Sequence, residues 1–220
     1  MPYICAEDHF KQLFMSMEKS ISTLRFDGGI LCLDFVNTIS NRNKPVLFDY
    51  LPGFKELLEW YDRTGVITAK VSHTLERLAK GYPQKAAVVF DKCIALRELL
   101  LRLFTAAIHR KAPDPSDIVL FNTYVADAYA NIEVAWRPAQ RQGELLFNAP
   151  ALEQLTWWLV KSALELYTGK SLQQVRQCPA CGWLFLDKSR NGSRKWCSMS
   201  VCGDIHKVQQ FHQRNKKKTK

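Results

Sequence analysis

The sequence has no apolar run long enough to cross a membrane. A membrane-spanning helix needs roughly 18 or more apolar residues in succession, and the best candidate, residues 28–36, is interrupted by Asp34. A cleavable signal peptide is not indicated either, because Glu7, Asp8 and Lys11 break up the apolar residues near the amino terminus. We therefore expect a cytoplasmic protein with no membrane partner.

The motifs of common enzyme classes are also missing. The sequence contains no glycine-rich phosphate loop, no His-Glu-x-x-His motif and no Gly-x-Ser-x-Gly nucleophile turn. Its five histidines are scattered, at positions 9, 73, 109, 206 and 212. We expect no enzymatic activity; the alternative is a small-molecule enzyme in the helical part of the chain.

Cysteine is present in an odd number, seven, and is unevenly distributed. Cys5, Cys32 and Cys93 stand singly among apolar neighbours, which is typical of buried thiols. The other four lie within residues 178–202. Disulfide frameworks are typical of small secreted domains, and this chain has the features neither of a small protein nor of a secreted one.

Positive charge is concentrated in the last fifth of the chain. The net charge is +10. Residues 178–220 hold ten lysines and arginines against two acidic residues, a difference of +8, which leaves +2 for residues 1–177. Such asymmetry favours a polyanionic partner, most often a nucleic acid.

Hydrophobic periodicity predicts a mostly helical chain with one small hairpin. The strongest helix is expected over residues 83–110, where apolar residues recur at steps of three and four. Alternation at residues 132–136, a turn at Gln142-Gly143 and a second apolar run at 144–147 predict two strands. Further helices are expected at residues 30–39, 53–62, 68–80, 115–130 and 150–168.

The four clustered cysteines have the spacing of a zinc site: Cys178, Cys181, Cys197 and Cys202. Zn²⁺ takes four thiolates at tetrahedral corners, and Gly182 gives the first Cys-x2-Cys turn its backbone freedom. Asn191-Gly192 predicts a hairpin between the two pairs, and a helix is expected from about Ser200, in a treble-clef-like layout. Four protein ligands close the coordination shell, so we predict one structural Zn²⁺.

The helix after the cysteines divides by angle into two faces. Val201, Ile205, Val208 and Phe211 are expected to pack on the hairpin. The opposite face and the hairpin are expected to contact nucleic acid, since Gln and Arg can bind base edges and Lys can bind phosphates. The expected contact residues are Lys188, Arg190, Arg194, Lys195, His206, Lys207, Gln210, Gln213, Arg214 and Lys217.

Residues 178–203 resemble the CGNR zinc finger, which in that family follows an amino-terminal ABATE domain. Upstream, Leu31-Cys32-Leu33-Asp34-Phe35-Val36-Asn37-Thr38 and Leu96-Arg97-Glu98-Leu99 resemble the ABATE domain. The resemblance implies a bacterial transcription regulator, often described as stress-induced, whose finger binds DNA. One departure stands out: the run Cys-Gly-Asn-Arg, from which the family takes its name, is here Cys202-Gly203-Asp204-Ile205, so that arginine is absent.

The fold class expected is α+β, mostly α, in four parts. Residues 1–25 form a poorly ordered lead-in, 26–172 an ABATE-like helical domain with the hairpin, 173–215 the treble-clef-like four-Cys zinc finger, and 216–220 a basic tail. The helical domain is expected to sense a small-molecule effector or to form a homodimer.

Three polar residues in apolar segments, Asp34, Asn37 and Arg97, are candidates for an effector pocket. The alternative is that they satisfy one another, or their neighbours, within a core. Two alternatives to DNA binding also stay open: RNA binding by the same basic surface, and a protein-interaction module for which zinc is the scaffold.

Overall fold

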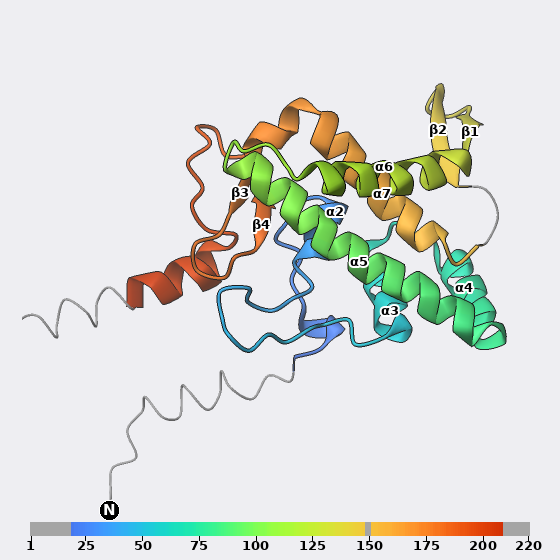
Figure 1. Ribbon diagram of the computed structural model, residues 1–220, viewed down its shortest axis with the longest axis horizontal. Coiled ribbons are helices and arrows are strands. Elements are labelled where there is room, and N and C mark those ends of the chain that lie inside the picture. Colours follow the sequence, from blue (N-terminus) through green and yellow to red (C-terminus); the bar gives the residue numbers. More distant parts are fainter. Residues whose placement is uncertain (1–18, 148–150, 209–220) are drawn as a thin grey trace, which may run out of the picture.

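The computed structural model describes residues 19–147 and 151–208. Helices form most of the body, and two short antiparallel hairpins are added to it (Figure 1). The helices are η1 (Ile21–Thr23), α2 (Leu31–Val36), α3 (Phe54–Thr64), α4 (Ala69–Gly81), α5 (Pro83–Ile108), α6 (Pro115–Ala130), α7 (Gln154–Thr168), η2 (Lys170–Gln174) and the π-helix η3 (Met199–Gly203). The strands are β1 (Ile132–Arg137), β2 (Gln142–Phe147), β3 (Val175–Gln177) and β4 (Leu184–Leu186).

The helix boundaries follow local sequence signals. Pro83 occupies the first turn of α5 and Pro115 that of α6, where a missing N–H costs nothing. The side chain of Thr68 caps α4 by accepting a hydrogen bond from the Val71 N–H. Gly65 ends α3 in a left-handed conformation with φ of 68°. The expected helix at residues 30–39 is shorter, because α2 ends at Val36 and Ile39 pairs with Asp49 in an isolated β-bridge.

The predicted stripe on α5 lies in the core. Five of its six residues are buried, Val89, Cys93, Leu96, Leu100 and Phe104, and the sixth, Ala107 near the end of the helix, is half-buried. Their neighbours across the interior come from α2 and α7, both of which contact α5. The amphipathic pattern therefore identified the packed face correctly.

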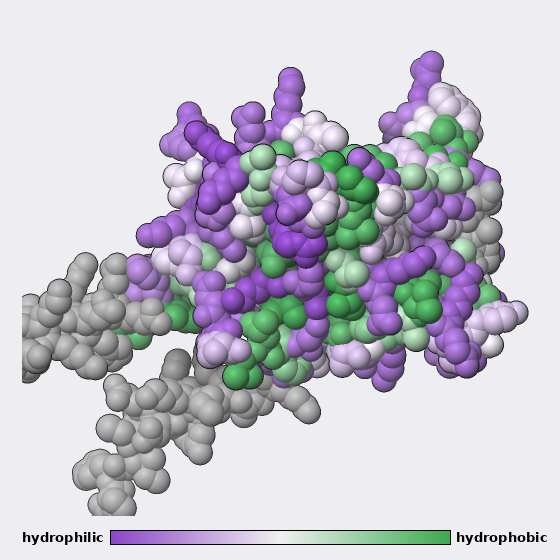
Figure 2. All heavy atoms as spheres, in the orientation of Figure 1, coloured by the Kyte–Doolittle hydropathy of each residue, from purple (hydrophilic) through white to green (hydrophobic). Residues whose placement is uncertain are grey.

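The predicted hairpin of β1 and β2 is present but projects from the body. Ile132 pairs with Phe147 and Arg137 with Gln142. Val134 and Trp136 are 73% and 65% exposed, so the alternation that predicts the strand does not correspond to burial here. Hydrophobic surface of this hairpin is visible in the space-filling view (Figure 2).

The core extends across the expected boundaries between the parts of the chain. Ile21 and Leu24 are 2% exposed, so part of the expected lead-in belongs to the core; residues 1–18 lie outside the described residues. Leu184 and Phe185 of β4 are fully buried in the same cluster. The finger and the helices therefore share one core.

Asn37 joins α2 to strand β4. Its side-chain amide donates to the Leu184 carbonyl at 2.8 Å and its oxygen accepts from the Leu184 N–H at 2.9 Å. Asn37 is fully buried, and thus substitutes for a neighbouring strand along that part of β4.

Replacing Asn37 with Ala should lower the free energy of unfolding by about 2–4 kcal/mol, because two buried backbone groups lose their partners. Denaturant unfolding of Asn37→Ala measures this loss. Asn122→Ala, at an exposed position on α6, is the matched control and should change stability by less than about 0.5 kcal/mol. Equal effects of the two substitutions would contradict the role given to Asn37.

Candidate metal centre and nucleic-acid interface

The first two cysteines lie in the turn between β3 and β4. The Cys178 N–H donates to the Trp183 carbonyl and the Gly182 N–H to the Cys178 carbonyl, both at 2.8 Å. Gly182 has φ of 75°, and a Cβ there would come within 2.9 Å of Asn43 Oδ1. Glycine is therefore required both by the backbone conformation and by the close approach of the 40–44 loop. The backbone freedom expected of Gly182 from the sequence is thereby confirmed.

The hairpin expected around Asn191-Gly192 is not the one that forms. The antiparallel pair is β3–β4, with Val175 opposite Leu186, and residues 188–196 form a loop with turns. Asp187 organises this loop: its carboxylate accepts hydrogen bonds from the Ser189 N–H, the Ser189 hydroxyl and the Arg194 N–H. The hydrogen bonds from Ser189 lower the pKa of Asp187. The Asp-x-Ser pattern is a local turn signal that sequence reasoning missed.

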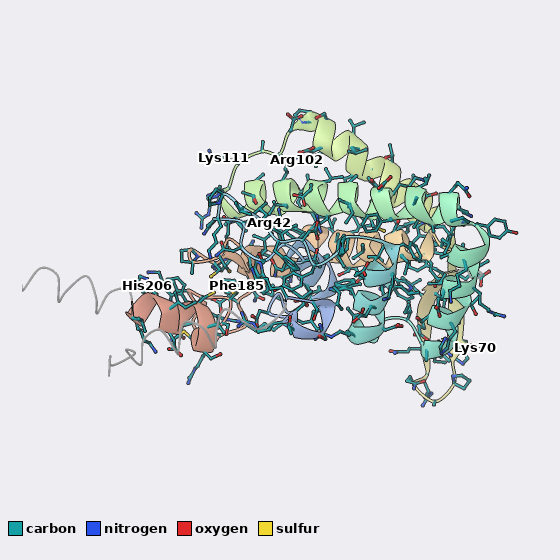
Figure 3. All side chains as sticks on the ribbon, turned by 90° about the horizontal axis from the view of Figure 1, so that it is seen from below. Arg42, Lys70, Arg102, Lys111, Phe185 and His206 are labelled. Atoms are coloured by element: carbon teal, nitrogen blue, oxygen red, sulfur yellow. The ribbon has the colours of Figure 1, made fainter. Side chains whose placement is uncertain are left out.

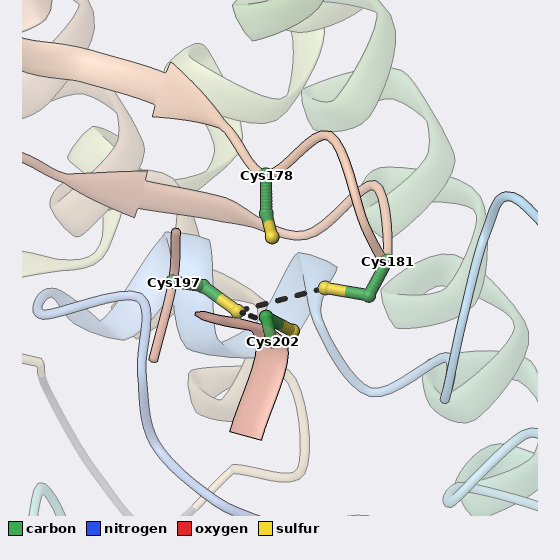
Figure 4. A group of neighbouring side chains, drawn as sticks. All are labelled: Cys178, Cys181, Cys197 and Cys202. Atoms are coloured by element: carbon green, nitrogen blue, oxygen red, sulfur yellow. Dashed lines mark hydrogen bonds between the residues drawn. The ribbon is translucent and has the colours of Figure 1, made fainter. Parts of the chain in front are cut away.

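The four cysteine sulfurs converge on one point (Figure 4). All lie within 4.8 Å of one another and all four residues are buried. The separations are 3.5 Å from Cys181 to Cys197 and 3.6 Å from Cys197 to Cys202. A tetrahedral Zn²⁺ with Zn–S bonds of about 2.3 Å places its sulfurs about 3.8 Å apart, so the arrangement fits this ion.

The cysteine thiols of the cluster also form hydrogen bonds with one another, which shifts their pKa values. Hydrogen bonding by Cys178 and Cys181, followed by burial, raises the pKa of Cys197. Hydrogen bonds from Cys181 and Cys197 lower the pKa of Cys178. Four thiolates so close together repel one another, and a divalent cation removes this cost. The centre holds one structural Zn²⁺.

The other described cysteines do not belong to this centre. Burial raises the pKa of both Cys32 and Cys93 to about 12. Both are fully buried free thiols, as expected; Cys5 lies outside the described residues.

The basic residues expected to contact nucleic acid have different environments. Lys188, Arg190 and Lys195 are exposed and form no ion pair within residues 19–147 and 151–208. Lys207 is exposed but pairs with Asp204 at 2.9 Å, so the acid at the departure from the family pattern offsets its charge. Gln210, Gln213, Arg214 and Lys217 lie outside the described residues.

Arg194, one of the expected contact residues, is half-buried and supports the finger from within. Its guanidinium donates to the carbonyls of Trp196 and Cys197 and lies 4.9 Å from the centre of the Phe185 ring. The hydrogen bonds hold the backbone next to a zinc ligand. In the sequence, Arg194 is simply one more basic residue between Arg190 and Lys195, so its inward orientation could not be predicted.

The apolar face expected on the terminal helix is also corrected. η3 continues as an α-helix through residues 204–208, but Ile205 is 47% and Val208 54% exposed. Val201 is half-buried, and Phe211 lies outside the described residues. Trp196 and Gly203 are the buried residues there instead. The His206 ring lies against that of Trp196, with ring centres 4.7 Å apart and ring planes tilted by 40°.

A cleft of about 630 Å³ lies between the finger and the 40–44 loop. Its charged or titratable lining residues outside the zinc site are Arg25, Lys44, Lys195 and His206, and no carboxylate lines it. Arg25 is paired with Asp27 at 2.6 Å, whereas Lys44 has no ion pair among the described residues. A zinc centre with four thiolates carries a charge of about −2. Part of the positive charge of the cleft therefore offsets the negative charge of this centre. Sequence reasoning missed Arg25 and Lys44, because both are far from the finger along the chain.

The three residues proposed for an effector pocket are engaged inside the protein. Asp34 accepts from the Gly28 N–H at 2.7 Å, and Asn37 holds Leu184. Arg97 binds both oxygens of Asp49, at 2.8 and 2.6 Å. None of the three lines the cleft at the finger, the hollow between α3, α4 and α5, or the pocket beside Ile108 and Leu172. Their places in the structure correspond to the alternative of groups that satisfy their neighbours.

The fold and the site together define a class: a protein with a helical domain that carries a four-cysteine zinc finger at one end. Family comparison gives the same division. Residues 174–215 match the CGNR zinc finger. Residues 29–170 match ABATE, a family described as "Putative stress-induced transcription regulator". The chain belongs to the ABATE family.

A search of curated proteins found no match. Within the described residues, no helix is both long and apolar enough to span a bilayer.

Cys197→Ser should reduce bound zinc from one ion per chain to none, because three thiolates leave the shell incomplete. Hydrogen exchange should then rise in residues 187–208, while β3 and β4 stay protected by Asn37 and the shared core. Metal analysis and hydrogen-exchange mass spectrometry measure both effects. Cys93→Ser, at a buried thiol 3.3 Å from the Thr156 hydroxyl, is the control and should keep its zinc. Stoichiometric zinc in Cys197→Ser would exclude the assigned ligand set.

Stability should depend on pH through Asp34. Burial raises the pKa of this carboxyl from 3.8 to about 7, so the native state binds its proton more tightly than the unfolded state does. Its contribution to stability is complete below pH 4 and is lost as the pH rises towards 7.

Asp34→Asn removes this titration. The free energy of unfolding of the variant, relative to the unsubstituted protein, should therefore increase between pH 4 and pH 7 and then level off. Denaturant unfolding at several pH values measures the difference. A difference that stays constant or falls over this range would refute the assignment.

Proposed function

We propose that this protein is a DNA-binding transcription regulator whose zinc finger supplies the DNA contact. The observation that carries the proposal is the group of exposed cations beside the zinc centre: Lys188, Arg190 and Lys195 on one loop, with Lys44 across the cleft. Exposed cations without carboxylate partners are the surface that phosphates bind. Membership of a regulator family supports the same function.

The zinc ion acts by fixing the loop that carries these cations. Cys181 precedes β4 and Cys197 ends the loop, so coordination ties both ends of residues 182–196 to one point. Asp187 and Arg194 then set the path of the backbone between them. A loop held in this way loses little conformational entropy when it meets DNA, which favours binding.

The helical domain contributes to the same surface and, we propose, also senses an effector or dimerises. The Arg42 N–H donates to the Cys181 carbonyl at 2.9 Å, and the Asn43 amide to the Pro179 carbonyl at 3.0 Å. The 40–44 loop is therefore attached to the zinc knuckle, and Lys44 has a fixed place relative to Lys195. DNA in the cleft would touch both parts of the chain.

A protein contact is the second candidate for the finger. Met199, Ile205 and Val208 are 55%, 47% and 54% exposed, and this apolar surface favours a protein partner. The affinity for such a protein partner would change little with salt concentration, whereas the affinity for a nucleic acid falls steeply as salt concentration rises.

The triple substitution Lys188→Gln, Arg190→Gln and Lys195→Gln should weaken duplex DNA binding about tenfold or more at low salt. Each lost phosphate contact also lowers the slope of log K against log salt by about 0.9, so the slope should fall by about 2 to 3. A binding titration at several salt concentrations, with single-stranded RNA as competitor, measures this and separates DNA from RNA binding.

The matched control removes three exposed cations elsewhere: Lys70→Gln, Arg77→Gln and Lys92→Gln. Lys70 lies at the end of the molecule opposite His206 (Figure 3). The control should retain most of its affinity. Equal losses in the two triple variants would show that only net charge matters and would refute a finger interface.

A further inference from the structure

A second hollow lies between α3, α4 and α5, away from the finger. It has a volume of about 740 Å³, within the roughly 300–1,000 Å³ range of small-molecule sites. In Figure 1, α4 and the end of α5 that adjoins it lie at the side of the molecule opposite η3. Neither the zinc centre nor the proposed DNA interface uses it.

The wall of this groove is largely apolar and partly aromatic. Phe54 and Leu58 come from α3, and Ala86 and Phe90 come from α5. Leu58 and Ala86 are 7% and 5% exposed, so they form the floor, whereas the two phenylalanines are half-buried. Such a wall favours an apolar ligand, and aromatic faces also attract cations.

A hydroxyl group also lies in the wall of the groove. Ser72 of α4 lines the groove and is 7% exposed. Its side chain makes no hydrogen bond to any residue in the described part of the chain. It is therefore available to a polar group of a ligand.

The rim is acidic, in contrast to the chain as a whole. Three carboxylates line the groove against two lysines: Glu59, Asp62 and Glu76 against Lys55 and Lys80. Glu76 is paired with Lys80 at 2.7 Å. Glu59 and Asp62, one turn apart on α3, have no ion pair within the described residues. Lys55 likewise has no ion pair within the described residues, and His73 lies 4.0 Å from Glu76. Three carboxylates against two lysines leave the groove a net charge of −1, in a protein whose net charge is +10.

We propose that this groove binds a small apolar organic cation. The apolar body of the ligand lies against Phe54, Leu58 and Phe90, and its positive charge lies near Glu59 and Asp62. Charge complementarity favours this cation over an anion of the same shape, because the exposed carboxylates of Glu59 and Asp62 attract the one and repel the other. The proposal goes beyond DNA binding and does not depend on it, since no residue of the groove belongs to the finger.

A pair of ions with the same shape and opposite charge tests the proposal. Tetraphenylphosphonium is the cation and tetraphenylborate the anion, and calorimetric titration of the full chain at about 0.15 M salt measures their binding, where screening acts over about 8 Å. The variant Ala87→Trp fills the groove from an exposed position on α5 and identifies the part of the binding that belongs to it. In this part, the cation should bind at least about tenfold more tightly than the anion.

The double variant Glu59→Gln and Asp62→Asn should weaken cation binding about tenfold. The control Asp91→Asn and Glu133→Gln removes two exposed carboxylates outside the groove and should leave the affinity within about twofold. The proposal is overturned if no cation binding depends on Ala87, if the anion binds there as tightly, or if both double variants behave alike.

Discussion

The four cysteine sulfurs converge within 4.8 Å of one another, and the arrangement of the finger depends on the cation that they hold as thiolates. Their mutual repulsion is removed when Zn²⁺ binds, and the ion then joins the β3–β4 turn to the start of η3. Residues 182–196 are thereby closed into a loop. Asp187 and Arg194 form hydrogen bonds inside that loop. Lys188, Arg190 and Lys195 remain exposed on its outer side. In the proposed function, the position of this positive surface therefore depends on the metal site.

The finger is also part of the helical core, which distinguishes it from an independent module. Asn37 pairs with both backbone groups of Leu184, and the Trp183 indole donates to the Ile39 carbonyl at 2.6 Å. The 40–44 loop is held in turn by Arg42, which binds both oxygens of Glu98 on α5. One face of the proposed interface therefore comes from the finger and the other from the helical domain, in fixed relative positions.

Local signals allowed most of the fold to be predicted. The zinc ligands were evident from spacing alone, and α3 to α7 from periodicity, prolines and caps, because each depends on residues close together in the sequence. Contacts between distant residues were not predictable. Arg194 turns inward onto Phe185, Ile205 and Val208 stay exposed, and Asp34, Asn37 and Arg97 each find separate partners instead of a common pocket. The same limit hid Lys44 and Arg25, which reach the finger only through the tertiary fold.

The central claim is that zinc creates the DNA-binding surface. Native mass spectrometry of the full chain, partly depleted of zinc and mixed with duplex DNA at low salt, tests it most directly, because each complex reports its own metal content. The account predicts that every protein chain bound to DNA carries one zinc ion, and that the chains without zinc are found only in the fraction that is not bound to DNA. DNA complexes of chains without zinc, or zinc-loaded chains that bind no DNA, would contradict it.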